Sequence, residues 1–275
     1  MLLAKNVTRT SNLKSLLAAV CLGRVRLYLM LATYADETGH HDDPQRRFVG
    51  IAGFLGHSDK WNRFDAEWRQ ACREEGVKEP FHMVEFAASR GQFGSWKDDE
   101  VRRKRLLGRL VAAIKNAEAY PIGAVVPIED FNSLTAGQRI SLGSDPYHVA
   151  FQTVTHEMAF AGALMSYPPE PISMVYARLK GYTGKAMQLW DAIKEYNLYG
   201  LWMGSFTPGD PKDYSQLQAA DLWAYELGAY WHDKNRWAFQ EIVRHALKMA
   251  GGHRFFQLCD KKFMLGALGE LDETE

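Results

Sequence analysis

The feature that most constrains the fold is the order in which strand-like and helix-like segments follow one another. Short runs rich in β-branched and aromatic residues predict strands, and apolar residues spaced three and four apart predict helices. These patterns predict strands at residues 27–35, 48–55, 122–128, 172–177 and 201–206, and helices at residues 58–75, 98–119, 146–165, 185–196 and 215–231. The order is strand, strand, helical insertion, strand, helix, strand, helix, strand, helix.

This order predicts the layout of a single sheet. The later alternation of strands and helices indicates parallel strands joined by helical crossovers, whereas the first two strands are typical of an antiparallel hairpin. We therefore expect an α/β fold with a mixed five-stranded sheet, helices on both faces, and a helical insertion at about residues 58–119. The chain has 275 residues, 47% of them apolar, so it can bury a sizeable core. The domain is expected at residues 30–234, followed by a peripheral helical segment at residues 235–275.

The first 29 residues are treated separately. An apolar run at residues 16–23 follows basic residues, an arrangement that resembles a signal peptide. Arg24 and Arg26 follow the run at once and no small-residue cleavage site is present, so a signal peptide is not favoured. Met30 lies just before the first motif. The hypothesis is that residues 1–29 include a misassigned start or an N-terminal extension, and a helix packed on the domain is the alternative.

Composition argues against several classes of protein. Lys plus Arg and Asp plus Glu each total 33, so the formal net charge is zero. That balance argues against histone-like electrostatic binding of nucleic acid, although a local basic groove stays open. Cys21, Cys72 and Cys259 lie far apart, which argues against a thiolate zinc site and favours a reducing, cytoplasmic setting. No apolar run reaches 18 residues, so no membrane span is expected.

Two acidic positions are the leading candidates for chemistry. Asp36 and Glu37, in the segment YADETG, stand at the end of the first strand, the edge where open α/β sheets build their sites. An aspartate that caps a turn is the structural alternative. Asp221, in SQLQAADLWAYE, shares a helix face with Ala224 and Gly228, small residues that let a helix approach a sheet closely. The alternative for Asp221 is a buried carboxylate bonded to the backbone.

Three further residues are weaker candidates. Glu157 lies on the helix at residues 146–165 beside His156, and an exposed glutamate is an equal alternative. His82 and Glu85, three residues apart in FHMVEF, are able to serve a metal or a proton transfer. A histidine among aromatic residues is more often a core residue. The sequence has no Walker A loop, no G-x-S-x-G elbow and no H-E-x-x-H motif, so nucleotide-dependent and triad chemistry have no support.

Acids that converge from separate parts of a chain make a site of oxygen ligands, which Mg²⁺ or Mn²⁺ prefers. Two such ions about 3.5–4 Å apart are able to hold the attacking and leaving oxygens of a phosphodiester. The candidate catalytic residues are Asp36, Glu37, His82, Glu85, Glu157 and Asp221, of which Asp36, Glu157 and Asp221 are the candidate metal ligands. This is the chemistry of ribonuclease H, whose fold has the element order predicted above.

Three segments carry a family resemblance. YADETG, FHMVEF and QLQAADLWAYE, in this order and spacing, resemble the family known as domain of unknown function 3800 (DUF3800). The resemblance covers roughly residues 30–231, and its best markers are the D-E-[ST]-G opening and the late Q-x-A-D-L-x-A-Y helix. The family is ribonuclease H-like and is often found near mobile elements and phage-defence genes.

The resemblance implies roles for particular residues. Asp36 matches the metal ligand on the first strand, and Asp221 matches the ligand on the last helix. Glu37, His82 and Gln218 match pattern positions without an assigned role.

One departure from the family pattern bears on activity. Such proteins tend to carry an acid at the end of the fourth core strand, but this sequence reads VYARLKG, with no carboxylate from Ala177 to Gly184. Fewer acids mean weaker metal binding. The leading hypothesis is a metal-dependent nuclease that uses Mg²⁺ or Mn²⁺ on RNA or DNA, in a phage-defence or mobile-element context. The alternative is a catalytically degenerate module that binds nucleic acid, a partner protein or a second copy without cleavage.

Overall fold

The structure is a computed structural model. It describes residues 31–38, 47–166, 170–178, 183–230, 235–249, 253 and 255–270. The segment at residues 1–29, for which a misassigned start or an extension was predicted, lies outside the described residues, so that hypothesis stays a prediction. Within the described ranges, no helix is both long and apolar enough to cross a membrane.

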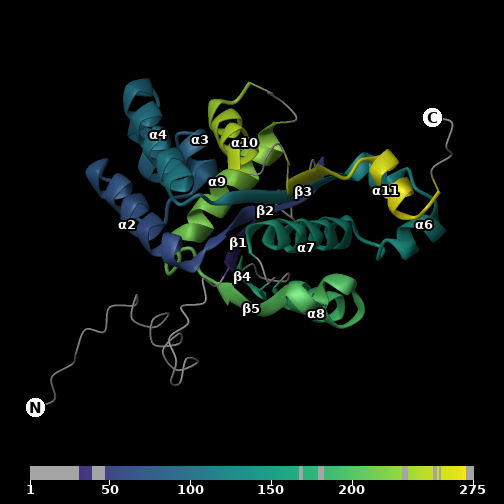
Figure 1. The fold of residues 1–275 in the computed structure, drawn as a ribbon. Coiled ribbons are helices and arrows are strands. Elements are labelled where there is room, and N and C mark those ends of the chain that lie inside the picture. The colour runs from purple at the N-terminus through teal and green to yellow at the C-terminus, as the bar shows by residue number, and fades with distance from the viewer. Residues whose placement is uncertain are drawn as a thin grey trace, which may run out of the picture.

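A mixed sheet forms the centre of the molecule (Figure 1). In the described part of the chain it has six strands in the order β5-β4-β1-β2-β3-β6. The strands are β1 (Leu31–Thr38), β2 (Phe48–His57), β3 (Tyr120–Pro127), β4 (Ile172–Ala177), β5 (Met203–Gly209) and β6 (Phe255–Leu258). β2 is antiparallel to β1 and β3, whereas the pairs β1–β4, β4–β5 and β3–β6 are parallel. The carboxyl ends of β1, β4 and β5 therefore meet at one edge of the sheet.

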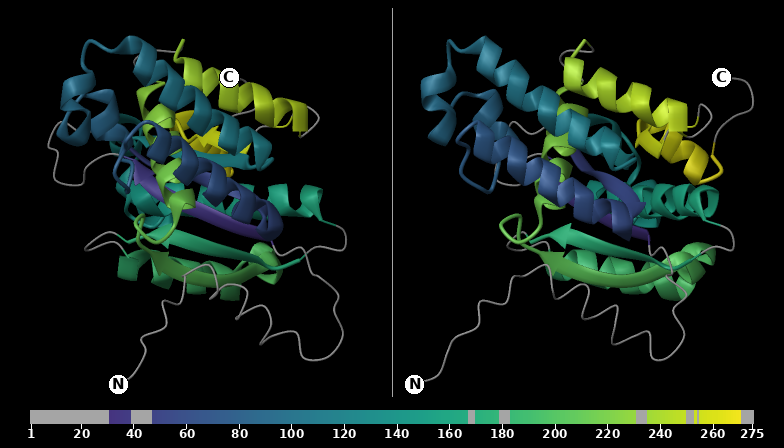
Figure 2. Two further views of the ribbon diagram at one scale, coloured as in Figure 1. Left: turned by 90° about the vertical axis from the view of Figure 1, so that its left-hand side faces the viewer. Right: turned by 60° about the vertical axis from the view of Figure 1, so that its left-hand side comes forward.

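Helices cover both faces of this sheet, which confirms the α/β class. The helical segments are α2 (Ser58–Glu74), α3 (Met83–Ala87), η1 (Gly91–Trp96), α4 (Glu100–Asn116), α5 (Ile128–Asn132), α6 (Ala136–Ser141), α7 (Pro146–Met165), α8 (Thr183–Tyr196), η2 (Leu198–Trp202), α9 (Ser215–Ala229), α10 (Trp237–Met249) and α11 (Lys261–Ala267). α2, α4, α9 and α10 lie on one side of the sheet, and α7 and α8 lie on the other (Figures 1 and 2). The segments α2 to α4 are the expected insertion between β2 and β3.

Two apolar cores, one on each face, hold the layers together. α9 packs directly against β1 and β2. Its buried side chains include the small residues Ala220 and Ala224. A Cβ atom added at Gly228 would lie 2.8 Å from Thr38 Oγ1 and 2.7 Å from the ring of Phe48. The close approach of helix to sheet that these small residues predicted is confirmed.

The structure differs from the sequence-based expectation at the C-terminal end of the domain. Residues 235–275 were expected to be helical and peripheral, but residues 255–258 form β6, which pairs with β3 and makes the sheet six-stranded rather than five-stranded. Helix α10 also buries Phe239 and Ile242 in the core beside α9. A four-residue strand is too short to show a period-2 pattern, which is why the sequence did not reveal it.

β1 also ends later than expected. The strand was predicted to stop at residue 35, but it continues to Thr38, so Asp36 and Glu37 lie inside the strand. Their pairing with β2 is regular, since Asp36 lies opposite Ala52 and Glu37 opposite Ile51. Because successive strand residues point to opposite faces of a sheet, the two acids are directed to opposite sides.

Candidate functional site

Asp36 points toward the face of the sheet that α9 covers. Tyr34, two residues earlier on the same face of β1, packs its ring against Trp61 of α2 and against Tyr214, which directly precedes α9. Asp221 lies in the middle of α9, the helix that crosses β1 and β2. Two carboxylates predicted from separate motifs are therefore brought together near the carboxyl end of β1.

The Asp36 carboxylate lies close enough to Asp221 for the two charges to repel each other. Burial raises the pKa of Asp36 well above its usual range, and the negative charges of Asp221 and Glu37 raise it further. The hydrogen bond that the Glu37 amide donates to Asp36 Oδ1, at 2.8 Å, opposes this rise. Burial also raises the pKa of Asp221. Two half-buried acids that repel each other favour a proton or a cation between them.

Asp221 is also bonded to the backbone. Its Oδ2 accepts a hydrogen bond from the amide of Met83 at 2.8 Å. Met83 is the first residue of α3, and the first amides of a helix have no partner within the helix. Asp221 thus caps α3 from another part of the chain. This agrees with the alternative interpretation of Asp221 as a buried carboxylate bonded to the backbone. The bond engages one of the two carboxylate oxygens, and 20% of the side chain remains exposed, so a ligand is able to reach it.

His82 stands beside this pair. Its Nδ1 lies 3.9 Å from Asp221 Oδ2, and 47% of its side chain is exposed. It directly precedes α3, whose C-terminal end is fixed by α4: Arg103 donates hydrogen bonds to the carbonyl of Phe86 at 2.8 Å and to Ser89 Oγ at 2.7 Å. α3 is therefore held at both ends, and His82 is presented to solvent at the edge of the site.

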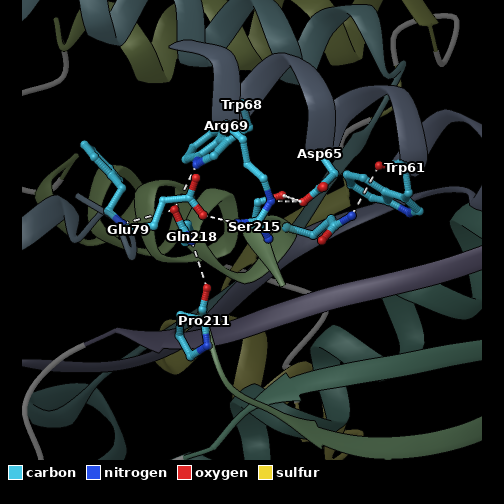
Figure 3. A network of polar contacts seen from close by, with 10 residues as sticks. Trp61, Asp65, Trp68, Arg69, Glu79, Pro211, Ser215 and Gln218 are labelled. Atoms are coloured by element: carbon cyan, nitrogen blue, oxygen red, sulfur yellow. Dashed lines mark hydrogen bonds and ion pairs between the residues drawn. The ribbon is translucent and has the colours of Figure 1, made fainter. Parts of the chain in front are cut away.

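Gln218, one turn before Asp221 on α9, fixes this helix in place (Figure 3). Its Oε1 accepts hydrogen bonds from Trp68 Nε1 at 2.9 Å and from the amide of Phe81 at 3.0 Å. Its Nε2 donates to the carbonyl of Pro211 at 2.8 Å. Gln218 is fully buried, so its position in the family pattern corresponds to a structural junction of α2, α9 and two connecting segments.

A second set of contacts joins the first turn of α9 to α2 (Figure 3). Ser215 donates a hydrogen bond to Asp65 Oδ1 at 2.6 Å, and Arg69 Nε donates to the same oxygen at 2.8 Å. Arg69 also forms an ion pair with Glu79. These contacts and those of Gln218 set the register of α9 on the sheet, and thereby the position of Asp221 opposite Asp36.

The other predicted site residues lie elsewhere. Glu37 points to the opposite face, where its Oε1 accepts a hydrogen bond from Tyr176 at 3.0 Å. The carboxylate of Glu85 lies against η1, because a Cβ at Gly91 would be 2.6 Å from Glu85 Oε2. Glu157 lies on α7, across the sheet from α9, with an oxygen 3.6 Å from His156 Nδ1.

The predicted ligand set of Asp36, Asp221 and Glu157 is thus not assembled. Across the ranges that the structure describes, no three His, Cys, Asp or Glu side chains are grouped so that they could hold a metal ion. The helix that carries Glu157 was predicted correctly at residues 146–165, but its apolar face packs on the side of the sheet opposite to Asp36 and α9. The sequence analysis did not identify Tyr176 as a partner of Glu37. Its position near the end of a predicted strand was the only feature that could have indicated this role.

Ala177 is the nearest neighbour of Asp36 on β4. The register pairs Ala35 with Tyr176, so the next pair along the two parallel strands is Asp36 and Ala177. Ala177 is buried on the same side as Leu217 of α9. The position at which the family resemblance expects an acid is therefore adjacent to Asp36, and here it carries a methyl group.

The raised pKa of Asp36 predicts how stability depends on pH. A carboxyl group whose pKa is higher in the folded state destabilises the fold once it is ionised. This cost is absent below the usual pKa of aspartate and grows as the pH rises through the raised value. Asp36→Asn should therefore raise the Tm of the metal-free protein at pH 7, by about 2–4 °C per kcal/mol of repulsion removed. The difference should vanish at about pH 3, below the unfolded-state pKa.

Thermal unfolding of the wild type and of Asp36→Asn in EDTA, followed by circular dichroism from about pH 3 to 8, measures this difference. A variant that is less stable than the wild type at pH 7 would show that the Asp36 carboxylate is a stabilising group, against the repulsion inferred here.

No protein-family model matches this chain, and no curated protein matches it. The structure brings the three segments YADETG, FHMVEF and QLQAADLWAYE to one site, since His82 and Met83 contact Asp221 and the charge of Asp221 acts on Asp36.

Proposed function

We propose that this protein is a metal-dependent phosphodiesterase that acts on nucleic acid. The observation that carries the proposal is the pairing of Asp36 on β1 with Asp221 on α9 at the carboxyl end of the strand. Two further features support it. The strand order β5-β4-β1-β2-β3, with β2 antiparallel to both neighbours, supports the ribonuclease H-like fold that the resemblance implies, and β6 would be an addition to that fold. The same two acids occupy the positions that the DUF3800 resemblance assigns to metal ligands.

The residues present suit a single Mg²⁺ or Mn²⁺ ion. Mg²⁺ keeps several waters and is commonly bound by one or two carboxylates together with phosphate oxygens of the substrate. Asp36 and Asp221 supply that number of carboxylates, and their mutual repulsion would be relieved by a cation. Such an ion, when bound, activates a water molecule and stabilises negative charge on a phosphate group.

The chain's own residues supply the remaining functions. Asp36 and Asp221 would hold the ion from two different elements, and Asp221 would keep its bond to the Met83 amide. His82, exposed beside Asp221, would be able to donate or accept a proton at the reacting phosphate. The contacts of Ser215 and Gln218 with α2 would contribute indirectly, because they hold α9 in place and so fix the distance between Asp36 and Asp221.

Basic side chains at the same edge support a nucleic-acid substrate. Arg47 directly precedes β2, Arg178 directly follows β4, and Lys212 lies three residues after β5. All three are exposed at the edge where β1 ends. Contacts of Lys and Arg with phosphates dominate the affinity of proteins for nucleic acids, so a chain with zero net charge needs only such a local group.

The proposal is tested by incubating the protein with end-labelled RNA and DNA, single- and double-stranded, in Mn²⁺, Mg²⁺, Ca²⁺ or EDTA. We expect cleavage of at least one nucleic acid in Mn²⁺ or Mg²⁺, and none in EDTA. Absence of cleavage for every substrate in both metals would contradict a nuclease.

Ala177 favours a second candidate function, a module of the same fold that binds nucleic acid or a protein partner without cleaving. If the missing acid limits metal binding, Ala177→Asp should strengthen Mn²⁺ binding by about tenfold, equivalent to about 1.4 kcal/mol. The reason is that a third carboxylate would stand on β4 next to Asp36. Ala177→Asn is the matched control, since it has nearly the same shape without the charge.

Calorimetric titration of Mn²⁺ into the three proteins measures this effect. Equal affinity in the wild type and in Ala177→Asp would show that the absent acid is not what limits the site.

A further inference from the structure

Glu37 differs from Asp36 in the direction of its side chain. The two residues are neighbours on β1, so they face opposite sides of the sheet. Asp36 faces α9, and Glu37 faces α7, where its Oε1 lies 3.0 Å from the hydroxyl of Tyr176. Glu37 is therefore directed away from the Asp36–Asp221 pair by the strand itself.

Two buried phenols hold the Glu37 carboxylate. Tyr176 donates its hydroxyl proton to Glu37, and the hydroxyls of Tyr176 and Tyr147 lie 3.0 Å apart. Tyr147 is also hydrogen-bonded to Glu37. Both tyrosines are almost fully buried. Burial and the nearby charge of Glu37 raise the pKa of both phenols, so they stay protonated donors at neutral pH.

This cluster joins three elements at the edge of the sheet. Tyr176 belongs to β4, and Tyr147 is the second residue of α7, whose start is capped by Asp145 at 2.8 Å from the Tyr147 amide. Glu37 is the residue of β1 that both tyrosines contact. The carboxyl end of β1 is consequently tied to β4 and to the first turn of α7 by one carboxylate.

Glu37 also acts directly on Asp36 through its backbone. Its amide donates the 2.8 Å hydrogen bond to Asp36 Oδ1. A side chain held on one face of the sheet thus fixes the peptide group that orients the acid on the other face. Loss of the Glu37 carboxylate would release both the end of the strand and this amide.

We infer that Glu37 is a positioning residue, which orients Asp36 through the strand backbone and is itself held by Tyr176 and Tyr147. The effect of Glu37 on metal affinity rests on the proposed function, whereas its effect on the order of the strand backbone does not. The positioning role requires an oxygen acceptor at position 37 but no negative charge. It therefore differs from the role of a metal ligand, which requires the carboxylate.

The test compares Glu37→Gln, which keeps an oxygen that accepts from both phenols, with Glu37→Ala, which does not. The first readout is amide hydrogen exchange at residues 36–38 in the metal-free protein. We expect at least a tenfold faster exchange in Glu37→Ala and a rate within twofold of wild type in Glu37→Gln. Tyr176→Phe, which keeps the ring and removes one donor, should fall between the two.

The second readout is Mn²⁺ affinity by calorimetry, with Asp36→Asn as the reference for a lost ligand. Glu37→Gln should bind within threefold of wild type, and Glu37→Ala at least tenfold more weakly. The inference is overturned if Glu37→Gln behaves like Glu37→Ala, or if Glu37→Ala leaves exchange unchanged. If the wild type binds no Mn²⁺, the proposed function fails, and the exchange rates alone still decide the positioning role.

Discussion

Asp36→Asn is expected to abolish metal-dependent cleavage of nucleic acid, lowering the rate by about 10³-fold or more, equivalent to about 4 kcal/mol of transition-state stabilisation. Asparagine keeps the shape of aspartate and the acceptor for the Glu37 amide, but it removes the negative charge that would hold a divalent cation. The measurement is the single-turnover cleavage rate in Mn²⁺ with substrate bound in both proteins. Because the same substitution should raise the Tm of the metal-free protein, a loss of cleavage cannot be ascribed to unfolding.

Asp59→Asn is the matched control for this loss. Asp59 is an exposed aspartate in the first turn of α2, and its substitution by asparagine removes one negative charge, as Asp36→Asn does. Its cleavage rate should equal that of the wild type. If Asp36→Asn cleaves as fast as Asp59→Asn, Asp36 is not a metal ligand.

Gln218→Ala is expected to give the largest loss of stability, about 3–4 kcal/mol in the free energy of unfolding. The substitution removes three hydrogen bonds and leaves Trp68 Nε1, the Phe81 amide and the Pro211 carbonyl without their partner at a fully buried position. Each buried polar group left unsatisfied costs about 1–3 kcal/mol. Urea unfolding of the metal-free proteins, followed by tryptophan fluorescence, measures the difference.

Gln70→Ala provides the comparison. Gln70 is an exposed glutamine of α2 whose Nε2 donates to Glu74 at 2.7 Å, and its loss should change stability by less than about 0.5 kcal/mol. A loss below about 1 kcal/mol for Gln218→Ala would show that water or rearranged side chains satisfy the three groups. The network would then not be what fixes α9 on the sheet.

Local patterns in the sequence were sufficient to predict much of the fold. β4 and α7 have the predicted bounds, at residues 172–177 and 146–165. For α7 the reason is local, since Asp145 caps the helix and Pro146 occupies its first position. The antiparallel hairpin of β1 and β2 and the parallel pairing of β4 with β5 were also predicted, because alternating strands and helices have few allowed connections. β6 was missed because its place in the sheet depends on β3, far away in the sequence.

The candidate site was predictable only in part. Asp36 and Asp221 each stood in a local pattern that indicated a sheet edge or a buried helix face, and the structure brings them together. Which side of the sheet a helix covers is a long-range property, so Glu157 could not be placed from its helix spacing. The tyrosines that bind Glu37 come from β4 and α7, and nothing near Glu37 in the sequence indicates them.

The most direct test of the central claim is calorimetric titration of Mn²⁺ into the wild type, Asp36→Asn and Asp221→Asn at neutral pH. The paired carboxylates predict binding of one ion per wild-type chain and loss of that binding in both variants. Binding that survives both substitutions, or a wild type that binds no Mn²⁺, would contradict a metal site between β1 and α9.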